Sequence, residues 1–365
     1  MNVTKMLQKF APPRIRVALL GLSLTACSSV GAGKIAPDQF NYNQAIGKAS
    51  SEQMLLNLIR LRYRDVPVFL AVNSVLTQYI YSTNASVAAS VGTVTSVDTD
   101  SLSAGVGARY VERPTITYSP LSGEEFADQL MTPIPGELIF SLMQSGWPMA
   151  DIMAMSMERL GGLRNPIFKE LGTEEGKERF RQFREAAILI IEIGRRDGIE
   201  LLRGSGPEEN EAYLVFASSV EPETAELIGR LRGMLGLSSE IQRFRVTRRR
   251  VNLPDGDMAM RVRSLLDLMG LLSGGVEVPS AHFGQQISRP TAAEDTARDL
   301  VPLRVCSGPE PPEHTFVRVR YLSQWFWIEA ADERSKESFG LLTYLFLMMA
   351  PAPTGGGPLL TVPTG

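Results

Sequence analysis

The sequence is poor in the residues that most often carry out chemistry. It has only two cysteines, Cys27 and Cys306, in 365 residues, which excludes a framework of disulfide bonds. Its two histidines, His282 and His314, are not in a metal-binding spacing such as H-E-x-x-H, and we expect both to be solvated in a loop. The G-x-S-x-G, P-loop and G-x-G-x-x-G motifs are also missing. We therefore expect no enzyme, no metal site and no cofactor.

An excess of basic residues is lacking as well. Residues 1–26 hold four of the 37 Lys and Arg residues and no Asp or Glu, so the remainder has 33 basic against 40 acidic residues, a net charge of −7. General nucleic-acid-binding proteins gain affinity by neutralising phosphates. We therefore expect no nucleic-acid partner.

No apolar run is long enough for a transmembrane helix, which needs about 20 residues. The apolar run near the C-terminus, from Phe339 to Ala350, has 12 residues and is interrupted by Gly340 and Thr343. A run of this length is typical of a buried helix.

The N-terminus has the pattern of a targeting segment. Residues 1–16 are basic, and residues 17–26, VALLGLSLTA, form a short apolar run, as in a secretory signal peptide. The run ends in LTAC, which resembles the lipobox of bacterial lipoproteins, in which small residues precede an invariant cysteine. The resemblance implies cleavage before Cys27 and acylation of this residue, so that several acyl chains anchor the protein where one would bind weakly.

The residue after the cysteine indicates which membrane is expected. In bacterial lipoproteins an Asp at this position tends to retain the protein at the inner membrane, and this chain has Ser28. The resemblance therefore implies a lipid-anchored protein of the outer membrane that faces the periplasm. A plain signal peptide with an incidental cysteine is the alternative.

The remaining sequence predicts an α+β fold of mixed helices and short antiparallel hairpins, with one long extended β-hairpin. Residues 27–40 are small and polar and are expected to form a tether. A helical region over 41–200 would contain the long hairpin at 79–118. An α+β region over 201–365 would contain a Pro-rich loop at 276–312.

Two local patterns give more detailed predictions. Ser50 and Gln53 have the spacing of a capping box, which predicts a helix that begins there. Its apolar stripe would comprise Met54, Leu55, Leu58 and Leu61. The segment FVRVRYLSQWFWIEA predicts a second hairpin, with Trp325 and Trp327 on one strand face.

The most unusual segment is NASVAASVGTVTSVDTDSLSAGVGARY, residues 84–110, in which small apolar and small polar residues alternate. The alternation predicts two strands, 79–94 and 102–118, joined at TSVDTDS. It is also the weak signature of transmembrane β-strands, which need about 9–11 residues. The possible membrane-facing residues are Tyr79, Tyr81, Ala85, Val87, Ala89 and Val91, followed by Leu102, Ala104, Val106, Ala108 and Tyr110.

Tyrosines mark one end of this predicted hairpin. Folding at the turn brings Tyr79 and Tyr81 toward Tyr118, as an interfacial aromatic girdle requires. One hairpin cannot close a barrel, and an open sheet edge is not tolerated in lipid, so insertion requires several copies that share a barrel. Faces of Ala, Ser and Gly are barely hydrophobic, and a water-facing arm is the other interpretation.

Basic residues gather in RFRVTRRRV, which predicts a patch that contacts anionic lipid headgroups or an acidic partner. The patch comprises Arg243, Arg245, Arg248, Arg249 and Arg250. A solvated strand face, balanced by acidic residues elsewhere, is the alternative. In RLRYRD, Arg60 and Arg64 lie one helical turn apart and are expected to form structural ion pairs.

Other segments, such as SEQMLLNLIRLRYRDVPVFLAV and RSLLDLMGLLSGGVEVP, are similar to those of bacterial lipoproteins of unknown activity. We expect a structural or interaction subunit of an envelope assembly, and an oligomeric β-barrel export pore is the sharpest form of this hypothesis. The alternative is a monomeric periplasmic binding or scaffold module without catalytic activity. The expected partners are membrane lipid, through the acyl anchor, and other proteins or further copies of this chain.

Overall fold

The computed structural model describes residues 32–90, 101–136, 138–139, 142, 149–203, 211–249, 251–284, 297–349 and 360–363. The fold is α+β with antiparallel hairpins, as predicted. The chain divides into two compact units, residues 1–53 and 54–365, which we describe one at a time.

In the first unit, the described residues belong to helix α3 (Ala32–Arg62), which continues into the second unit. The predicted tether over 27–40 is therefore wrong from Ala32 onward, and Ser50 lies within the helix instead of capping it. The turns of α3 before Ser50 were not predicted. Lys48, in the last of these turns, forms an ion pair with Glu52 at 3.9 Å. These turns lack a regular apolar stripe, which is the main sequence signal for a helix.

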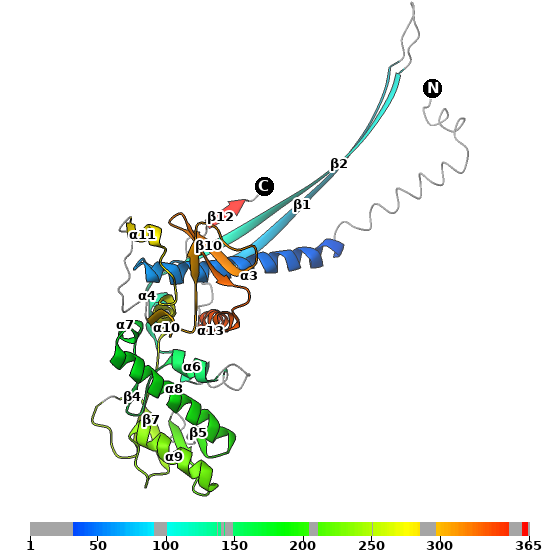
Figure 1. Ribbon diagram of the computed structural model, residues 1–365. Coiled ribbons are helices and arrows are strands. Elements are labelled where there is room, and N and C mark those ends of the chain that lie inside the picture. Colours follow the sequence, from blue (N-terminus) through cyan, green and yellow to red (C-terminus); the bar gives the residue numbers. More distant parts are fainter. Residues whose placement is uncertain are drawn as a thin grey trace, which may run out of the picture. The chain divides into compact units, whose positions relative to one another are not determined.

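The second unit contains further helices and all the described strands (Figure 1). The helices are α4 (Glu124–Met131), α6 (Met149–Ser156), α7 (Phe168–Leu171), α8 (Glu174–Arg195), α9 (Pro222–Leu235), α10 (Leu265–Ser273), α11 (Ser280–Gly284) and α13 (Glu333–Met349). The strands are β1 (Phe69–Ser90), β2 (Ser101–Leu121), β3 (Met157–Leu160), β4 (Leu163–Arg164), β5 (Ile199–Arg203), β6 (Ala212–Phe216), β7 (Arg243–Thr247), β8 (Asp257–Val262), β9 (Cys306–Gly308), β10 (Thr315–Tyr321), β11 (Gln324–Glu329) and β12 (Leu360–Pro363).

Several helices begin and end where polar side chains or glycine satisfy the backbone. Thr173 caps α8 by accepting a hydrogen bond from the Gly176 amide at 3.0 Å. Ser264 and Asp267 form a reciprocal capping box at the start of α10. Helix α9 ends at Gly236, whose φ of 67° lies in the left-handed region that favours glycine.

One hydrophobic core joins the end of α3 to α4, α10, α13 and the sheet β10-β11-β9. The predicted stripe on α3 is confirmed, because Met54, Leu55 and Leu58 are buried and Leu61 packs against the same core. Phe69, the first residue of β1, stacks on Phe346 of α13 with ring centroids 4.5 Å apart. The start of the long hairpin is therefore part of this core.

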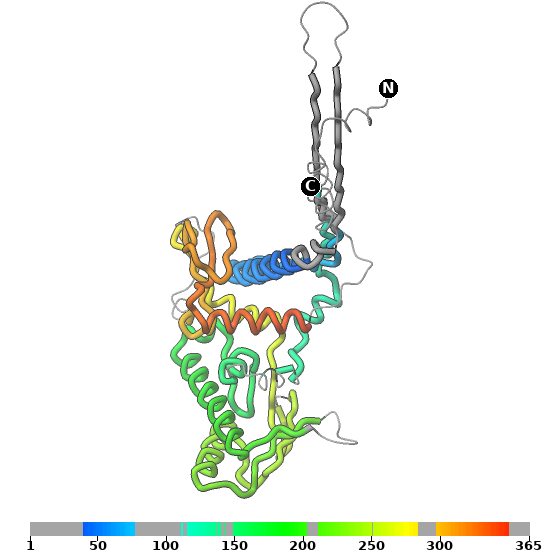
Figure 2. The backbone as a smooth tube through the Cα atoms, turned by 90° about the vertical axis from the view of Figure 1, so that its right-hand side faces the viewer, coloured from blue at the N-terminus to red at the C-terminus, as the bar shows by residue number. Residues whose placement is uncertain are grey.

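A second core lies between helices α8 and α9 and the six-stranded sheet β4-β3-β8-β7-β6-β5. Only the β7–β8 pair in this sheet is parallel; the other described ladders are antiparallel. Helix α8 runs from one core to the other, with Phe180 in the first and Phe183 in the second (Figure 2).

The expected boundary between regions 41–200 and 201–365 does not follow these cores. It falls within β5, at residues 199–203, and β3 and β4 join the same sheet from before it. Helix α13, from the end of the chain, packs in the first core with α3. Local patterns missed this arrangement because strand pairing across about 100 residues leaves no mark on the local sequence.

Residues expected to form a Pro-rich loop at 276–312 contain helix α11 and strand β9, while 285–296 lie outside the described residues.

His314 is exposed, as predicted, but the prediction of a solvated His282 is wrong, since this residue is only 1% exposed. The Tyr63 hydroxyl donates to Nδ1 of His282 at 2.6 Å, and Nε2 of His282 donates to the Leu322 carbonyl at 3.1 Å. A carbonyl only accepts, which places the ring proton on Nε2.

The junction between α3 and β1 depends on the buried side chain of Asn57, which is not part of the predicted apolar stripe. Asn57 is 0% exposed. Its Oδ1 accepts from the Val68 amide at 2.9 Å, and its Nδ2 donates to the Val68 carbonyl at 2.8 Å. One side chain thus satisfies both backbone groups of the residue immediately before the hairpin.

We predict that Asn57→Ala lowers the free energy of unfolding by about 2–3 kcal/mol, because two backbone groups lose a buried partner. Chemical denaturation followed by circular dichroism measures this loss. The control Asn43→Ala changes an exposed residue of the same helix and should have little effect. Equal stability of the two variants would show that the junction does not depend on Asn57.

The turn of the β10–β11 hairpin is strained. Leu322 and Ser323 connect the paired residues Tyr321 and Gln324, and their φ angles are 45° and 66°. A two-residue turn of this kind strongly favours Asn-Gly, because other residues adopt left-handed backbone at a cost.

We predict that the double variant Leu322→Asn/Ser323→Gly raises the free energy of unfolding by about 1–2 kcal/mol, because it relieves this strain. The measurement is again chemical denaturation. In contrast, Ser218→Gly at an exposed residue without positive φ should be neutral or destabilising. A destabilised double variant would contradict the interpretation of strain.

Candidate functional site

The long hairpin is the segment that the sequence marks as functional, and the structure confirms two paired strands. The register of β1 and β2 runs from Phe69 opposite Leu121 to Ser90 opposite Ser101. The first strand begins ten residues before the predicted start at Tyr79, since residues 69–72 and 74–78 are also paired. The predicted turn and the predicted site residue Val91 lie among residues 91–100, outside the described residues.

The register brings the predicted apolar positions of both strands onto one face of the ribbon. Ala85 is opposite Val106, Val87 is opposite Ala104, Ala89 is opposite Leu102 and Tyr81 is opposite Tyr110. Residues directly opposite each other in an antiparallel pair share a face. The other face has Ser82 opposite Arg109, Asn84 opposite Gly107 and Ser86 opposite Gly105. We call these the apolar face and the polar face.

This register is specific, because a slip of one residue would place most of these apolar positions, such as Ala85 and Val87, opposite a polar or glycine position. One irregularity occurs near the start of the hairpin, where Asn73 is an extra residue between Val72 and Ser74. Its Nδ2 donates to the Ser119 hydroxyl at 2.6 Å. A bulge of this kind sets which face each later residue occupies.

All four tyrosines of the hairpin occupy the apolar face, but at two levels. Tyr81 is directly opposite Tyr110, and Tyr79 follows opposite Glu112. Tyr118, which we expected to meet Tyr79 and Tyr81, is opposite Val72, close to the start of the hairpin. From Tyr81 to Ser90 the apolar face carries no charged residue, so a continuous uncharged band extends from the tyrosine pair toward the turn.

The length of this uncharged band matches a membrane dimension. The residues from Tyr81 to Ser90 extend about 30 Å along the strand. A strand tilt of about 40° would reduce this to about 23 Å, close to the apolar band of about 25 Å in outer-membrane barrels.

The edges of the ribbon differ along its length. Among the described residues, β1 pairs only with β2, while the other edge of β2 pairs with β12 over Thr115–Tyr118. Beyond Thr115, both edges of the ribbon lack a described strand partner. Unpaired edges are templates for pairing with another chain.

The predicted arginine patch is only partly available to a partner. Arg245 forms two hydrogen bonds with Asp257, at 3.0 and 2.9 Å, and an ion pair with Glu211 at 3.4 Å. The hydrogen bonds and charge of Asp257 raise the pKa of Arg245. The Arg243 guanidinium lies 3.6 Å from the centre of the Tyr213 ring. Arg245 therefore has a structural role and is not part of an open patch.

Of the other members of that patch, Arg248 and Arg249 are exposed, and Arg250 lies outside the described residues.

Trp325 and Trp327 share one face of β11, as predicted, and the core residues Phe326 and Ile328 lie on the other face. Trp327 is 9% exposed, and the Arg318 guanidinium lies 5.8 Å from the Trp325 ring.

No group of three His, Cys, Asp or Glu residues that could hold a metal occurs within the described part of the chain. Cys306 is buried, and burial raises the pKa of its thiol, so the thiolate is disfavoured. The predicted acylation site, Cys27, lies outside the described residues. Among the helices that the structure describes, none is both long enough and apolar enough to cross a membrane.

The chain matches no protein-family model, no curated protein and no solved structure. A functional hypothesis for it therefore depends on its own residues.

Proposed function

We propose that this chain is a lipid-anchored outer-membrane subunit whose long hairpin forms a shared β-barrel with hairpins of other copies. The observation that supports this most is the register of β1 and β2, which places the predicted membrane-facing positions of both strands, among them Ala85, Val87 and Val106, on one face. A barrel wall needs this division, with one face toward lipid and the other toward the lumen.

The lipobox-like LTAC sequence supports the membrane location, because acylation of Cys27 would hold the chain at a bilayer surface. The Tyr81–Tyr110 pair would lie at the near interface. Glu112, the next charged residue on the apolar face, would remain in the headgroup region or in water. The polar turn, with Asp98 and Asp100, would emerge on the far side.

Open edges explain why several copies are needed. Each unsatisfied backbone group in the hydrocarbon core costs several kcal/mol, so a single hairpin with two free edges would not be stable there. In a ring, β1 of one copy would pair with β2 of the next, and rotation about the ring axis would close the barrel. Because β12 pairs with β2 over Thr115–Tyr118, the shared ladder would begin beyond Thr115.

We predict that shortening the hairpin abolishes assembly without unfolding the body. Replacement of residues 80–111 by Asn-Gly joins the register partners Tyr79 and Glu112 through a favoured two-residue turn. Native mass in mild detergent should fall from several chains per particle to one, and conductance across planar bilayers should disappear. Far-ultraviolet circular dichroism and thermal unfolding should show a folded body.

A matched pair of unacylated variants distinguishes membrane association through the hairpin from membrane association through the lipid anchor. Cys27→Ala proteins, exported by an ordinary signal peptide with and without residues 80–111, should differ in carbonate-resistant membrane association. If the longer protein is soluble and monomeric, the barrel is wrong and the chain is a periplasmic scaffold or binding module. If the shortened protein is unfolded, the strands belong to the core.

A further inference from the structure

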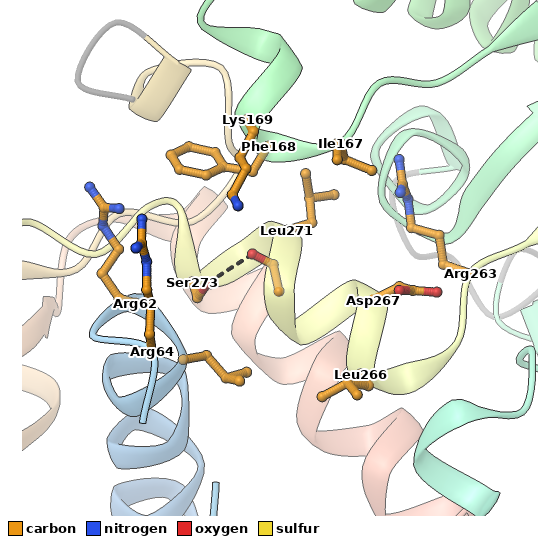
Figure 3. Close-up of a pocket in the computed structure, with 12 residues that line it drawn as sticks. Arg62, Arg64, Ile167, Phe168, Lys169, Arg263, Leu266, Asp267, Leu271 and Ser273 are labelled. Atoms are coloured by element: carbon orange, nitrogen blue, oxygen red, sulfur yellow. Dashed lines mark hydrogen bonds between the residues drawn. The ribbon is translucent and has the colours of Figure 1, made fainter. Parts of the chain in front are cut away.

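A cavity of about 420 Å³ lies between the end of α3, the start of α7 and helix α10 (Figure 3). These elements come from distant parts of the sequence and meet at the first hydrophobic core. Arg64 of the lining lies five residues before Phe69, where the hairpin begins, but nothing in the barrel proposal uses the cavity.

The lining of the cavity is strongly basic. Arg62, Arg64, Lys169 and Arg263 line it, against one carboxylate, Asp267. Asp267 is already used in the capping box of α10, where it accepts from the Ser264 amide at 3.3 Å. Within the described chain, Arg64 and Lys169 form no ion pair, so the expectation of a structural ion pair for Arg64 is wrong. In a protein with excess negative charge, this concentration of cations predicts an anionic ligand.

Arg263 is the strongest indication of such a ligand. It is 2% exposed, and its Nη2 donates to the carbonyls of Asn165 and Pro166, at 3.3 and 3.0 Å. Its buried Nε has no acceptor, and no carboxylate in the described chain forms an ion pair with it. Burial lowers the pKa of this guanidinium. The charges of Asp267, Glu158 and Glu170 oppose this shift, but none of them forms an ion pair with Arg263 that would offset the cost of its burial.

Another buried arginine shows that this fold can satisfy a guanidinium when no ligand is needed. Arg232, which is 6% exposed, donates to the carbonyls of Ser238 and Ile241 and to the side chain of Gln242. It also lies 4.3 Å from the centre of the Phe216 ring. Arg263 lines a cavity and lacks this complete set of acceptors.

Apart from Ser273 and Gly270, the remaining lining is apolar. Leu61, Ile167, Phe168, Leu266 and Leu271 line the cavity between the basic residues. In Figure 3, Arg62, Arg64 and Lys169 gather at one end, Arg263 and Asp267 lie at the other, and Leu271 lies between them. A small inorganic anion would leave these apolar surfaces uncovered. An amphiphile with an anionic head would use both kinds of surface.

We propose that this cavity binds a phosphate monoester attached to an apolar body, as in an anionic phospholipid. The charges of Arg64, Lys169 and Arg263, against the one carboxylate of Asp267, suit a dianion, and guanidinium groups match the geometry of phosphate oxygens. The apolar residues would contact the first carbons of the attached chains. Inorganic phosphate has the same head-group chemistry without the apolar body. Comparing its affinity with that of a phospholipid therefore shows which of the two is the ligand.

Isothermal titration calorimetry on the folded full-length chain tests this, with three probes below their micelle concentrations. The probes are dihexanoyl phosphatidic acid, dihexanoyl phosphatidylcholine and inorganic phosphate. We expect saturable binding of the phosphatidic acid, at least tenfold tighter than binding of either other probe. Arg64→Ala and Lys169→Ala should each weaken this binding about tenfold, whereas Arg248→Ala, at an exposed arginine outside the cavity, should not.

A steric variant provides a test that leaves the charges unchanged. A Cβ added at Gly270, which lines the cavity, would have no neighbouring atom within 4 Å, so Gly270→Leu should fold and fill the space. It should weaken phosphatidic acid binding at least tenfold. Equal binding of inorganic phosphate would overturn the amphiphilic ligand. Absence of saturable binding, or unchanged binding in all cavity variants, would overturn the site.

Discussion

The double hydrogen bond between the Asn57 side chain and the backbone of Val68 is the constraint on which the hairpin depends. It fixes the chain between the buried end of helix α3 and the start of strand β1. The next residue, Phe69, then enters the core and stacks on Phe346. Side chains alternate along a strand, so this anchor and the bulge at Asn73 together determine which residues share each face of the ribbon.

This constraint determines the composition of the two faces along the whole described length of the hairpin. At the start of the hairpin, Thr117 and Ser119 of β2 are buried. Their face continues outward as the polar face, which contains Gly105 and Ser103. The opposite face, which includes Tyr118, continues as the apolar face. The body therefore supports a ribbon whose two faces differ, as a barrel wall requires.

The sequence predicted the parts of this structure that leave a local mark. Alternation predicted both strands, and the apolar stripe predicted the buried face of α3, because each pattern repeats within a few residues. The burial of His282 and Asn57 and the pairing of Arg245 with Asp257 were missed. Their partners come from other segments or from the backbone, which sequence periodicity does not reveal.

The basic cavity is the clearest example of this limit. The Arg-rich strand was conspicuous because its arginines are adjacent, yet Arg245 is neutralised within the fold. The cavity brings together Arg64, Lys169 and Arg263, about 100 residues apart from one to the next, and only the packing of α3, α7 and α10 makes them neighbours. Residue spacing therefore identified the hairpin but not this site.

The two-faced hairpin in a bilayer is tested most directly by site-directed spin labelling of reconstituted protein. In a Cys306→Ser background, single cysteines at Asn84, Ala85, Ser86, Val87, Ala88 and Ala89 would carry nitroxides. The account predicts that accessibility to oxygen, which concentrates in lipid, rises and falls with a period of two and peaks at Ala85, Val87 and Ala89. Uniform accessibility to a water-soluble relaxation agent at all six positions would contradict it.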